Sequence, residues 1–271
     1  MNPVVTIKDL DKQYGNHKVL NRLNLQIYQG EIFGILGMNG AGKTTLLECM
    51  EGLRDYDSGI IEIQGTIGIQ LQSASLPSYI KGKEAVSLIA GWRKIGKDNE
   101  ILREMGICEL EEKIYHEMST GQQRRLHLAL ALIGNPDLIF LDEPAAGLDV
   151  EGQILLHQQI RQLKQRGKTI LLASHDMREV EDLCDRIMVL YQGNVLFCGT
   201  VEELSRKTGA CYQIQITTAE GIKKYEAKDI EGSVLKILED CKKRQLKIQD
   251  MQISRGSLEQ HFMELMKGEE K

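Results

Sequence analysis

The amino-acid sequence predicts an α/β protein with a mainly parallel sheet, followed by a small α+β appendage. Near-continuous apolar runs at residues 32–36, 137–142 and 169–173 are typical of parallel strands buried on both faces. Strands and helices alternate after Pro136, as crossover connections between parallel strands require. From about residue 209 the pattern changes to short alternating strands and amphipathic helices, which indicates a separate appendage.

The first part of the chain is predicted to contain short strands and then a helical region. The expected strands, besides residues 32–36, cover residues 4–7, 19–27, 58–65 and 66–72. Residues 79–133 have a mostly helical pattern, clearest at 84–90 and 126–133. Further on, the turn residues 192–194 separate two apolar runs and predict a hairpin.

The appendage is expected to have the element order ββαβα. Its predicted elements are a strand at 212–217, a helix at 234–246, a strand at 246–253 and a final helix opened by the capping-box residues 257–260. No convergent set of polar residues in it suggests catalysis. The predicted domains are therefore residues 1–207, with a helical subdomain at about 76–134, and an accessory domain at 208–271.

Composition restricts the class of protein. The net charge of −5 argues against a nucleic-acid-binding protein, which usually carries a basic face. The six cysteines include no C-x-x-C pair, so we interpret them as thiols in a reducing cytoplasm rather than as disulfides or zinc ligands. No apolar run approaches the ~18 residues needed to span a bilayer, and no signal-peptide pattern opens the chain. We expect a chain that does not cross a membrane by itself.

A phosphate-binding loop is the strongest functional signal. Residues 37–44 fit the pattern G-x-x-x-x-G-K-[ST], between a predicted strand and a predicted helix. Glycines let successive amide groups turn inward around an anion, and a helix N-terminus adds positive potential there. Lys43 is placed to reach the β- and γ-phosphates, and the Thr44 hydroxyl to ligate Mg²⁺. The residues predicted to bind nucleotide here are Gly37, Asn39, Gly40, Ala41, Gly42, Lys43, Thr44 and Thr45.

Two further patterns lie downstream. The apolar strand 138–141 ends in Asp142 and Glu143, which suits one acid for Mg²⁺ and another for activating water, although a solvated strand end has the same pattern. Ser119, Gly121 and Gln122 lie in a polar turn that opens a helix. That turn suits an anion, and it also suits an ordinary helix cap.

With these motifs in place, residues 4–204 resemble the ATP-binding-cassette (ABC) ATPases. The family signature L-S-G-G-Q corresponds here to residues 118–122, with Met118 and Thr120 as departures. The resemblance implies a P-loop NTPase with a RecA-like core, an antiparallel β subdomain and a helical subdomain. It implies ATP and Mg²⁺ as cofactors, with Asp142 at the metal and Glu143 as catalytic base.

The resemblance assigns roles to four more residues. Tyr14 matches the aromatic that stacks on adenine, although a tyrosine ending a strand is also common. Gln72 matches the glutamine that links Mg²⁺ and water to the helical subdomain, with Gln70 as its positional rival. Asp149 matches the loop that crosses the dimer interface, and His175 the switch histidine near the γ-phosphate. The other five histidines have no such setting and are assigned no role.

The resemblance also implies partners. Two chains are expected to pair head to tail and to hold ATP between the phosphate loop of one and residues 119–122 of the other. A separate membrane permease is expected to place the chain at the cytoplasmic face of the membrane. The loop 37–45 and the tail 257–262 look like those of bacterial type-2 exporter ATPases. The alternatives are a non-transport cassette acting on ribosomes or DNA, and a regulatory cassette.

Overall fold

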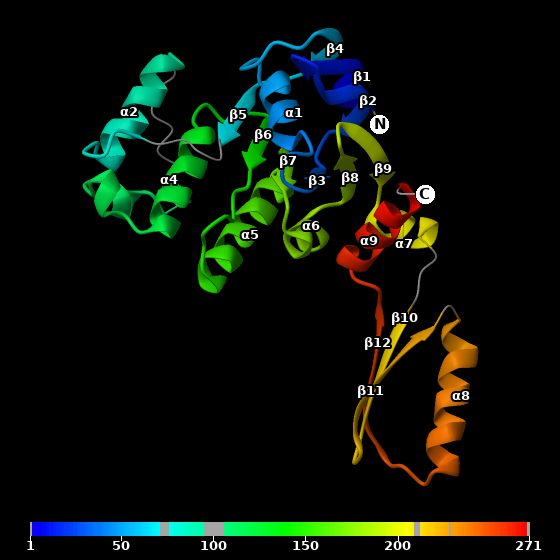
Figure 1. The fold of residues 1–271 in the computed structure, drawn as a ribbon. Coiled ribbons are helices and arrows are strands. Elements are labelled where there is room, and N and C mark those ends of the chain that lie inside the picture. The colour runs from blue at the N-terminus through cyan, green and yellow to red at the C-terminus, as the bar shows by residue number, and fades with distance from the viewer. Residues whose placement is uncertain (1, 71–75, 95–105, 209–211, 228, 270–271) are drawn as a thin grey trace. The chain divides into compact units, whose positions relative to one another are not determined.

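The computed structural model describes residues 2–70, 76–94, 106–208, 212–227 and 229–269 (Figure 1). The chain divides into two compact units, Met1–Cys198 and Gly199–Lys271. The domain boundary at 207/208 stays a prediction, and the two units are described separately below.

The first unit is built around a six-stranded sheet. Its strands, in spatial order, are β5 (Ile67–Gln70), β6 (Leu138–Asp142), β7 (Thr169–Ser174), β3 (Ile32–Leu36), β8 (Arg186–Tyr191) and β9 (Asn194–Gly199). The first five are parallel to one another. Every residue of β3, β6 and β7 is buried, as their continuous apolar runs require. The predicted α/β class is confirmed.

Successive residues of these strands face two different cores. Ile139, Leu141 and Ile170 pack with α5 (Val150–Gln165) and α6 (Met177–Leu183). Phe33 and Phe140 point to the other face, toward α1 (Lys43–Met50) and an antiparallel sheet. Figure 1 shows α1 on one side of the strands and α5 and α6 on the other. Both faces of the sheet are therefore covered.

The antiparallel sheet has the order β2-β1-β4. Its strands are β1 (Pro3–Tyr14), β2 (His17–Tyr28) and β4 (Ser58–Ile63). β1 is much longer than the predicted strand at 4–7, because it pairs with a neighbour on each side along most of its length. Its buried Leu10 joins the same core as Phe33 and Phe140.

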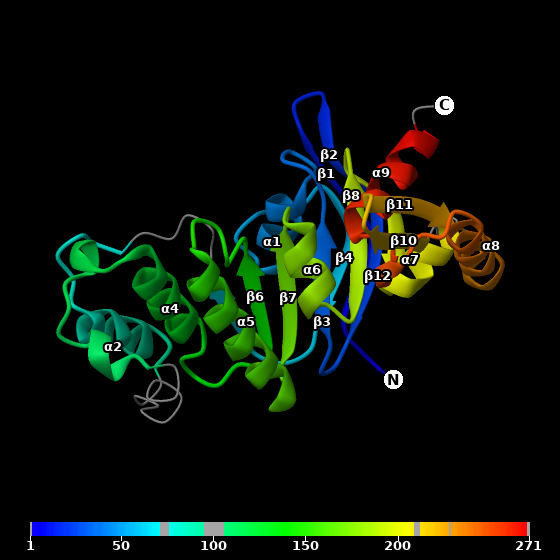
Figure 2. The ribbon, with the colours of Figure 1, turned by 90° about the horizontal axis from the view of Figure 1, so that it is seen from below.

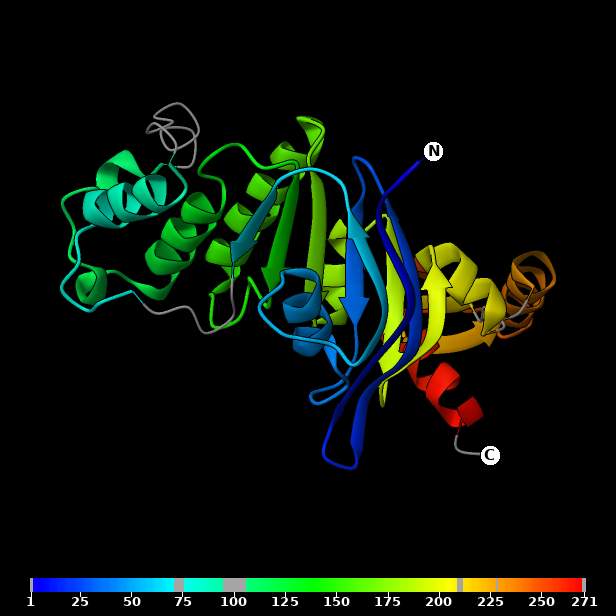
Figure 3. The ribbon, with the colours of Figure 1, turned by 90° about the horizontal axis from the view of Figure 1, so that it is seen from above.

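The helical subdomain lies at the β5 edge of the large sheet (Figures 2 and 3). Its described elements are α2 (Gly82–Trp92), the short 3₁₀ turns Cys108–Leu110 and Tyr115–Glu117, and α4 (Thr120–Ala131). The mostly helical pattern predicted for residues 79–133 is thus confirmed within the described part. Among the described residues, no helix combines the length and apolar character that crossing a membrane demands.

The second unit contains α7 (Val201–Lys207) and the appendage. The appendage elements are β10 (Tyr212–Thr218), β11 (Gly221–Ala227), α8 (Ile230–Lys243), β12 (Ile248–Arg255) and α9 (Leu258–Glu269). This is the predicted ββαβα order, with the antiparallel sheet order β11-β10-β12. Ile214, Ile216 and Ile237 form its small core. α8 begins before the predicted start at 234 because the Asp229 side chain accepts from the Gly232 amide at 2.9 Å and caps the helix.

A buried histidine on α4 makes the stability of this fold depend on pH. His127 is 8% exposed, its Nε2 lies 2.9 Å from the Tyr115 hydroxyl, and its Nδ1 has no hydrogen-bond partner. Burial first, and then the charge of Arg124, lowers the pKa of His127 from 6.5 to about 4. The unfolded chain thus binds the extra proton more readily than the folded chain between these two values.

We predict that His127→Gln flattens the acid side of the stability profile. Neutral His127 contributes fully to the free energy of unfolding above pH 6.5. As pH falls toward about 4, this contribution is lost, and the free energy of unfolding decreases by up to about 3 kcal/mol. The measurement is the free energy of unfolding by urea between pH 4 and pH 8. His116→Gln is the control, because His116 is an exposed histidine of the same subdomain. Parallel profiles for wild type and His127→Gln would contradict the prediction.

Candidate nucleotide-binding site

The predicted phosphate loop lies between β3 and α1 and requires glycine at two places. A Cβ on Gly37 would come within 2.5 Å of the Leu190 carbonyl oxygen. Gly42 has φ +106, and a Cβ there would come within 2.8 Å of the Val19 carbonyl oxygen. The loop closes around a cavity of about 460 Å³, whose lining residues are Val19, Met38, Asn39, Gly40, Ala41, Gly42, Lys43, Thr44, Thr45 and Glu143.

Lys43 carries a buried positive charge beside this cavity. Its side chain is 7% exposed, and its Nζ donates to the Gly37 carbonyl oxygen at 2.7 Å. The Glu143 carboxylate lies 3.7 Å from the same nitrogen. Burial lowers the pKa of Lys43, whereas the negative charges of Glu143 and Asp142 act in the opposite direction. The phosphate loop therefore holds the Lys43 ammonium group within reach of an anion in the cavity.

Asp142 and Thr44 form a second pair, with the chemistry of a magnesium site. The Thr44 hydroxyl donates to Oδ2 of Asp142 at 3.0 Å. Asp142 is 3% exposed, and its Oδ1 is buried without a hydrogen-bond partner. Burial is the main cause that raises the pKa of Asp142. A hydroxyl and an unpaired carboxylate oxygen are ligands that Mg²⁺ accepts, so these residues fit the expected metal.

Glu143 and His175 come together across the ends of two neighbouring strands. Glu143 follows β6, has the unusual φ of +49, and donates its amide to the Ala173 carbonyl oxygen at 2.9 Å. Its Oε2 lies 2.7 Å from Nδ1 of His175, which follows β7. The Glu143 side chain is 7% exposed and that of His175 56%. The pair therefore joins a buried carboxylate to an imidazole that solvent reaches.

The signature residues and Asp149 line a different cavity. Ser119 caps α4: its hydroxyl accepts from the Gln122 amide at 3.3 Å, and the Gln122 side chain accepts from the Ser119 amide. Asp149 caps α5 by accepting from the Gly152 amide at 2.8 Å. Both helix starts border a cavity of about 420 Å³ that also contains Gly121. None of its lining residues is shared with the phosphate-loop cavity.

Tyr14, predicted to bind nucleotide, lies outside the phosphate-loop cavity. It ends β1 and is 43% exposed. Lys12 Nζ and the Arg54 guanidinium lie 5.2 and 5.4 Å from its ring centre. Gln72 lies outside the described residues. Its rival Gln70 is 2% exposed, and neither atom of its amide has a hydrogen-bond partner.

Sequence reasoning missed several residues around the site. Val19 belongs to β2, far along the chain from the loop whose cavity it lines. Burial and the charges of Asp142 and Glu48 raise the pKa of Glu51 to about 7. Glu179, at 4% exposed, accepts from the Ser174 hydroxyl beside His175. In the sequence both acids look like ordinary solvated helix positions, so no local signal marks them.

The parallel sheet, the phosphate loop and the acids at the strand ends define a P-loop ATPase. The family model "ABC transporter" matches residues 20–146. An uncharacterized ABC transporter ATP-binding protein of Methanocaldococcus jannaschii is 36% identical over 213 residues, covering 76% of this chain and 81% of the relative. The chain belongs to the ATP-binding proteins of ABC transporters.

Other relatives and structures agree with this membership. A daunorubicin resistance ATP-binding protein of Streptomyces coeruleorubidus is 34% identical, covering 76% of this chain and 71% of the relative. The Nod factor export ATP-binding protein I of Burkholderia orbicola is also 34% identical, and the match covers 78% of this chain and 76% of the relative. A solved ATP-binding subunit of an ABC transporter has a TM-score of 0.69 at 25% identity and covers 76% of this chain and 93% of that one. The expected P-loop cassette fold and ATP as the nucleotide are thereby confirmed.

We predict that Lys43→Ala weakens ATP binding by roughly 10- to 100-fold, because a charged hydrogen bond to phosphate contributes about 1.5–3 kcal/mol. The measurement is a titration with a fluorescent ATP analogue. Lys164→Ala serves as control, since Lys164 pairs with Asp185 and lines no part of the loop cavity. Unchanged affinity in Lys43→Ala, with wild-type melting, would refute the role of this lysine.

Proposed function

We propose that this chain hydrolyses ATP with Mg²⁺, in a head-to-tail dimer, and drives export through a separate membrane permease. The observation that carries the proposal is the convergence of Lys43, Asp142, Glu143 and His175 at one edge of the sheet. They come from three segments of the chain, since Lys43 lies after β3, Asp142 and Glu143 at the end of β6, and His175 after β7. Together they supply the groups that phosphoryl transfer to water needs.

In this proposal each residue has one task. Lys43 holds the β- and γ-phosphates. Thr44 and Asp142 hold Mg²⁺, with Gln72 as the further expected ligand, and bound Mg²⁺ would neutralise phosphate charge. Glu143 takes the proton of the attacking water. His175, 2.7 Å from Glu143, orients that carboxylate and lies at the exposed side where the γ-phosphate would enter.

The head-to-tail dimer is supported by the separation of the two cavities. The phosphate loop and the signature residues of one chain do not share a cavity, so one chain alone leaves the γ-phosphate open on one side. The capped start of α4 in a second copy is a helix N-terminus that favours an anion. Ser119, Gly121, Gln122 and Asp149 would complete the partner's site, while Tyr14 stacks on adenine in its own chain.

The permease contact is proposed at residues 76–92. A cavity of about 280 Å³ lies where α2 and α4 meet β5, and it is lined mainly by apolar side chains, among them Leu53, Leu76, Ile89 and Trp92. Trp92 is 78% exposed and Leu53 58%. Apolar groups left open to water beside a concave site favour a partner helix. Such a partner would hold the chain at the cytoplasmic face of the membrane.

The names of the relatives support export as the direction of transport. Those names include daunorubicin resistance, Nod factor export and linearmycin resistance, the last for a protein of Bacillus subtilis. The relatives do not favour a ribosome-associated, DNA-associated or regulatory cassette. The cargo would be selected by the permease.

We predict that Glu143→Gln binds ATP normally but hydrolyses it at least about 100-fold more slowly, because the amide keeps the size of the carboxylate and loses its basicity. Turnover is measured as phosphate release, and dimer formation in ATP by light scattering. Glu62→Gln, an exposed acid on β4, is the control. A Glu143→Gln protein with wild-type turnover would show that another group is the base.

We predict that cysteines at Leu88 and Trp92 crosslink to an integral membrane protein in native membranes. Both positions are exposed, at 57% and 78%, and both lie on α2. The exposed native Cys108 and Cys198 are first replaced by serine. Ile60→Cys, on β4 and 52% exposed, is the matched control and should not crosslink. Crosslinks from α2 only to ribosomal protein or DNA would exclude the exporter assignment.

A further inference from the structure

The loop that carries His175 is closed by a buried hydroxyl. Ser174 is the last residue of β7 and is fully buried. Its Oγ accepts from the amide of Asp176 at 3.0 Å, so the hydroxyl bridges the two residues on either side of His175. Asp176 then caps α6 by accepting from the amides of Arg178 and Glu179. The backbone around His175 is thus held from both sides.

A buried carboxyl group orients that hydroxyl. The Ser174 hydroxyl donates its single proton to Oε2 of Glu179 at 2.6 Å, which leaves its lone pairs free for the Asp176 amide. Glu179 lies on the inner face of α6 and is 4% exposed. Without an acceptor at this position the hydroxyl would be free to rotate and donate elsewhere. The carboxyl group therefore determines how the loop is closed.

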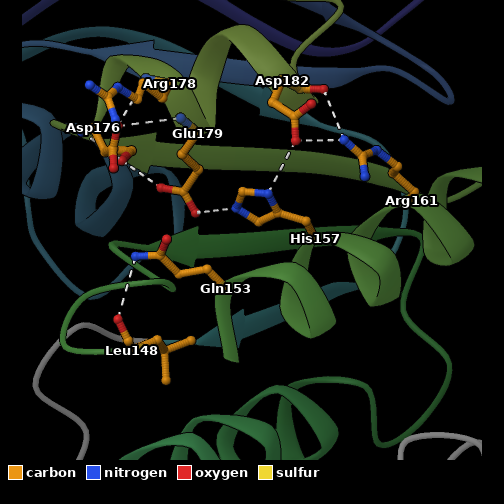
Figure 4. A network of polar contacts seen from close by, with 9 residues as sticks. Leu148, Gln153, His157, Arg161, Asp176, Arg178, Glu179 and Asp182 are labelled. Carbon is orange, nitrogen blue, oxygen red and sulfur yellow. Dashed lines mark hydrogen bonds and ion pairs between the residues drawn. The ribbon is translucent and has the colours of Figure 1, made fainter. Parts of the chain in front are cut away.

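Glu179 also lies close to a histidine of α5. His157 Nε2 lies 3.7 Å from Glu179 Oε1, and His157 Nδ1 lies 3.2 Å from Oδ2 of Asp182, which also binds Arg161 (Figure 4). α5 is the helix that Asp149 caps, and Gln153 on it reaches the Leu148 carbonyl oxygen at 3.5 Å. The helix α5 thus borders both the predicted dimer-interface loop and the Glu179 side chain that binds Ser174 next to His175.

We propose that Glu179 is a positioning residue for hydrolysis, which acts through the Ser174 hydroxyl to hold His175 against Glu143. The proposal rests on the role assigned to His175 above. The charges point the same way: burial, together with the negative charges of Asp176 and Glu143, raises the pKa of Glu179 to about 7, while the hydrogen bond from Ser174 and the charge of His175 act in the opposite direction. The carboxyl group is therefore electrostatically linked to the pair it supports. If Glu179 only fastened α6 to the sheet, its replacement would lower the stability of the fold and leave the rate of ATP hydrolysis unchanged.

The test is a double-mutant cycle between Glu179 and His175, with the full-length protein. Single-turnover hydrolysis, affinity for a fluorescent ATP analogue and melting are measured for Glu179→Ala, Glu179→Gln, Ser174→Ala, His175→Ala and the double variant Glu179→Ala with His175→Ala. Ser174→Ala leaves almost the same volume and covers the case in which Glu179→Ala does not fold. Lys164→Ala removes another contact of α5 and is the matched control.

We expect Glu179→Ala and Ser174→Ala to slow hydrolysis at least about tenfold, with ATP affinity within about twofold of wild type. Glu179→Gln should recover most of the rate, because its amide oxygen still accepts from Ser174. In the His175→Ala background, Glu179→Ala should cause no further loss. Losses that multiply in the double variant, or wild-type rates in Glu179→Ala and Ser174→Ala when His175→Ala is slow, overturn the proposal. Wild-type hydrolysis by His175→Ala instead refutes the role of His175, and this inference with it.

Discussion

The parallel register of three neighbouring strands is the constraint on which the site depends. Leu36 at the end of β3 is paired with Ser174 at the end of β7, and Asp142 at the end of β6 is paired with Ala173. Because parallel strands end at the same edge, the segments that follow them leave the sheet side by side. The phosphate loop, the acid pair and His175 are those three segments. Their proximity follows from hydrogen bonding between backbones, before any side chain contributes.

On that edge a buried lysine lies beside two buried acids, where low solvent exposure strengthens the interactions between charges. Lys43, Glu143 and His175 form a chain of contacts at 3.7 and 2.7 Å, and Asp142 is paired with Thr44 beside them. Buried charges are tolerated when each has a partner, and a phosphate entering the cavity would add a second anion beside Lys43, next to Glu143. The unpartnered Oδ1 of Asp142 leaves one ligand position open to a cation. The site thereby suits ATP and the Mg²⁺ proposed for it.

The rest of the first unit connects this edge to its proposed partners. α4 begins at the signature residues and ends beside β5, where the apolar cavity of α2 opens. α5 begins at Asp149 and carries His157 toward Glu179. Helices are stiff elements, so a displacement at one end can be carried to the other. A second copy at one end and a permease at the other would therefore act on the same few rigid elements.

From the sequence alone the phosphate loop, the buried strands, the acid pair and the helical region could be predicted, because each depends on local spacing or periodicity. The roles of Tyr14, Gln72, Asp149 and His175 came from a family resemblance, and their assignment stays a proposal. Only the tertiary structure brought His175 to Glu143, separated by 32 positions in the chain. Only the tertiary structure shows that Val19, Glu51 and Glu179 lie near the site. The positions of these residues depend on burial and on contacts between segments distant in the chain. Burial and long-range contacts cannot be predicted from the local sequence pattern.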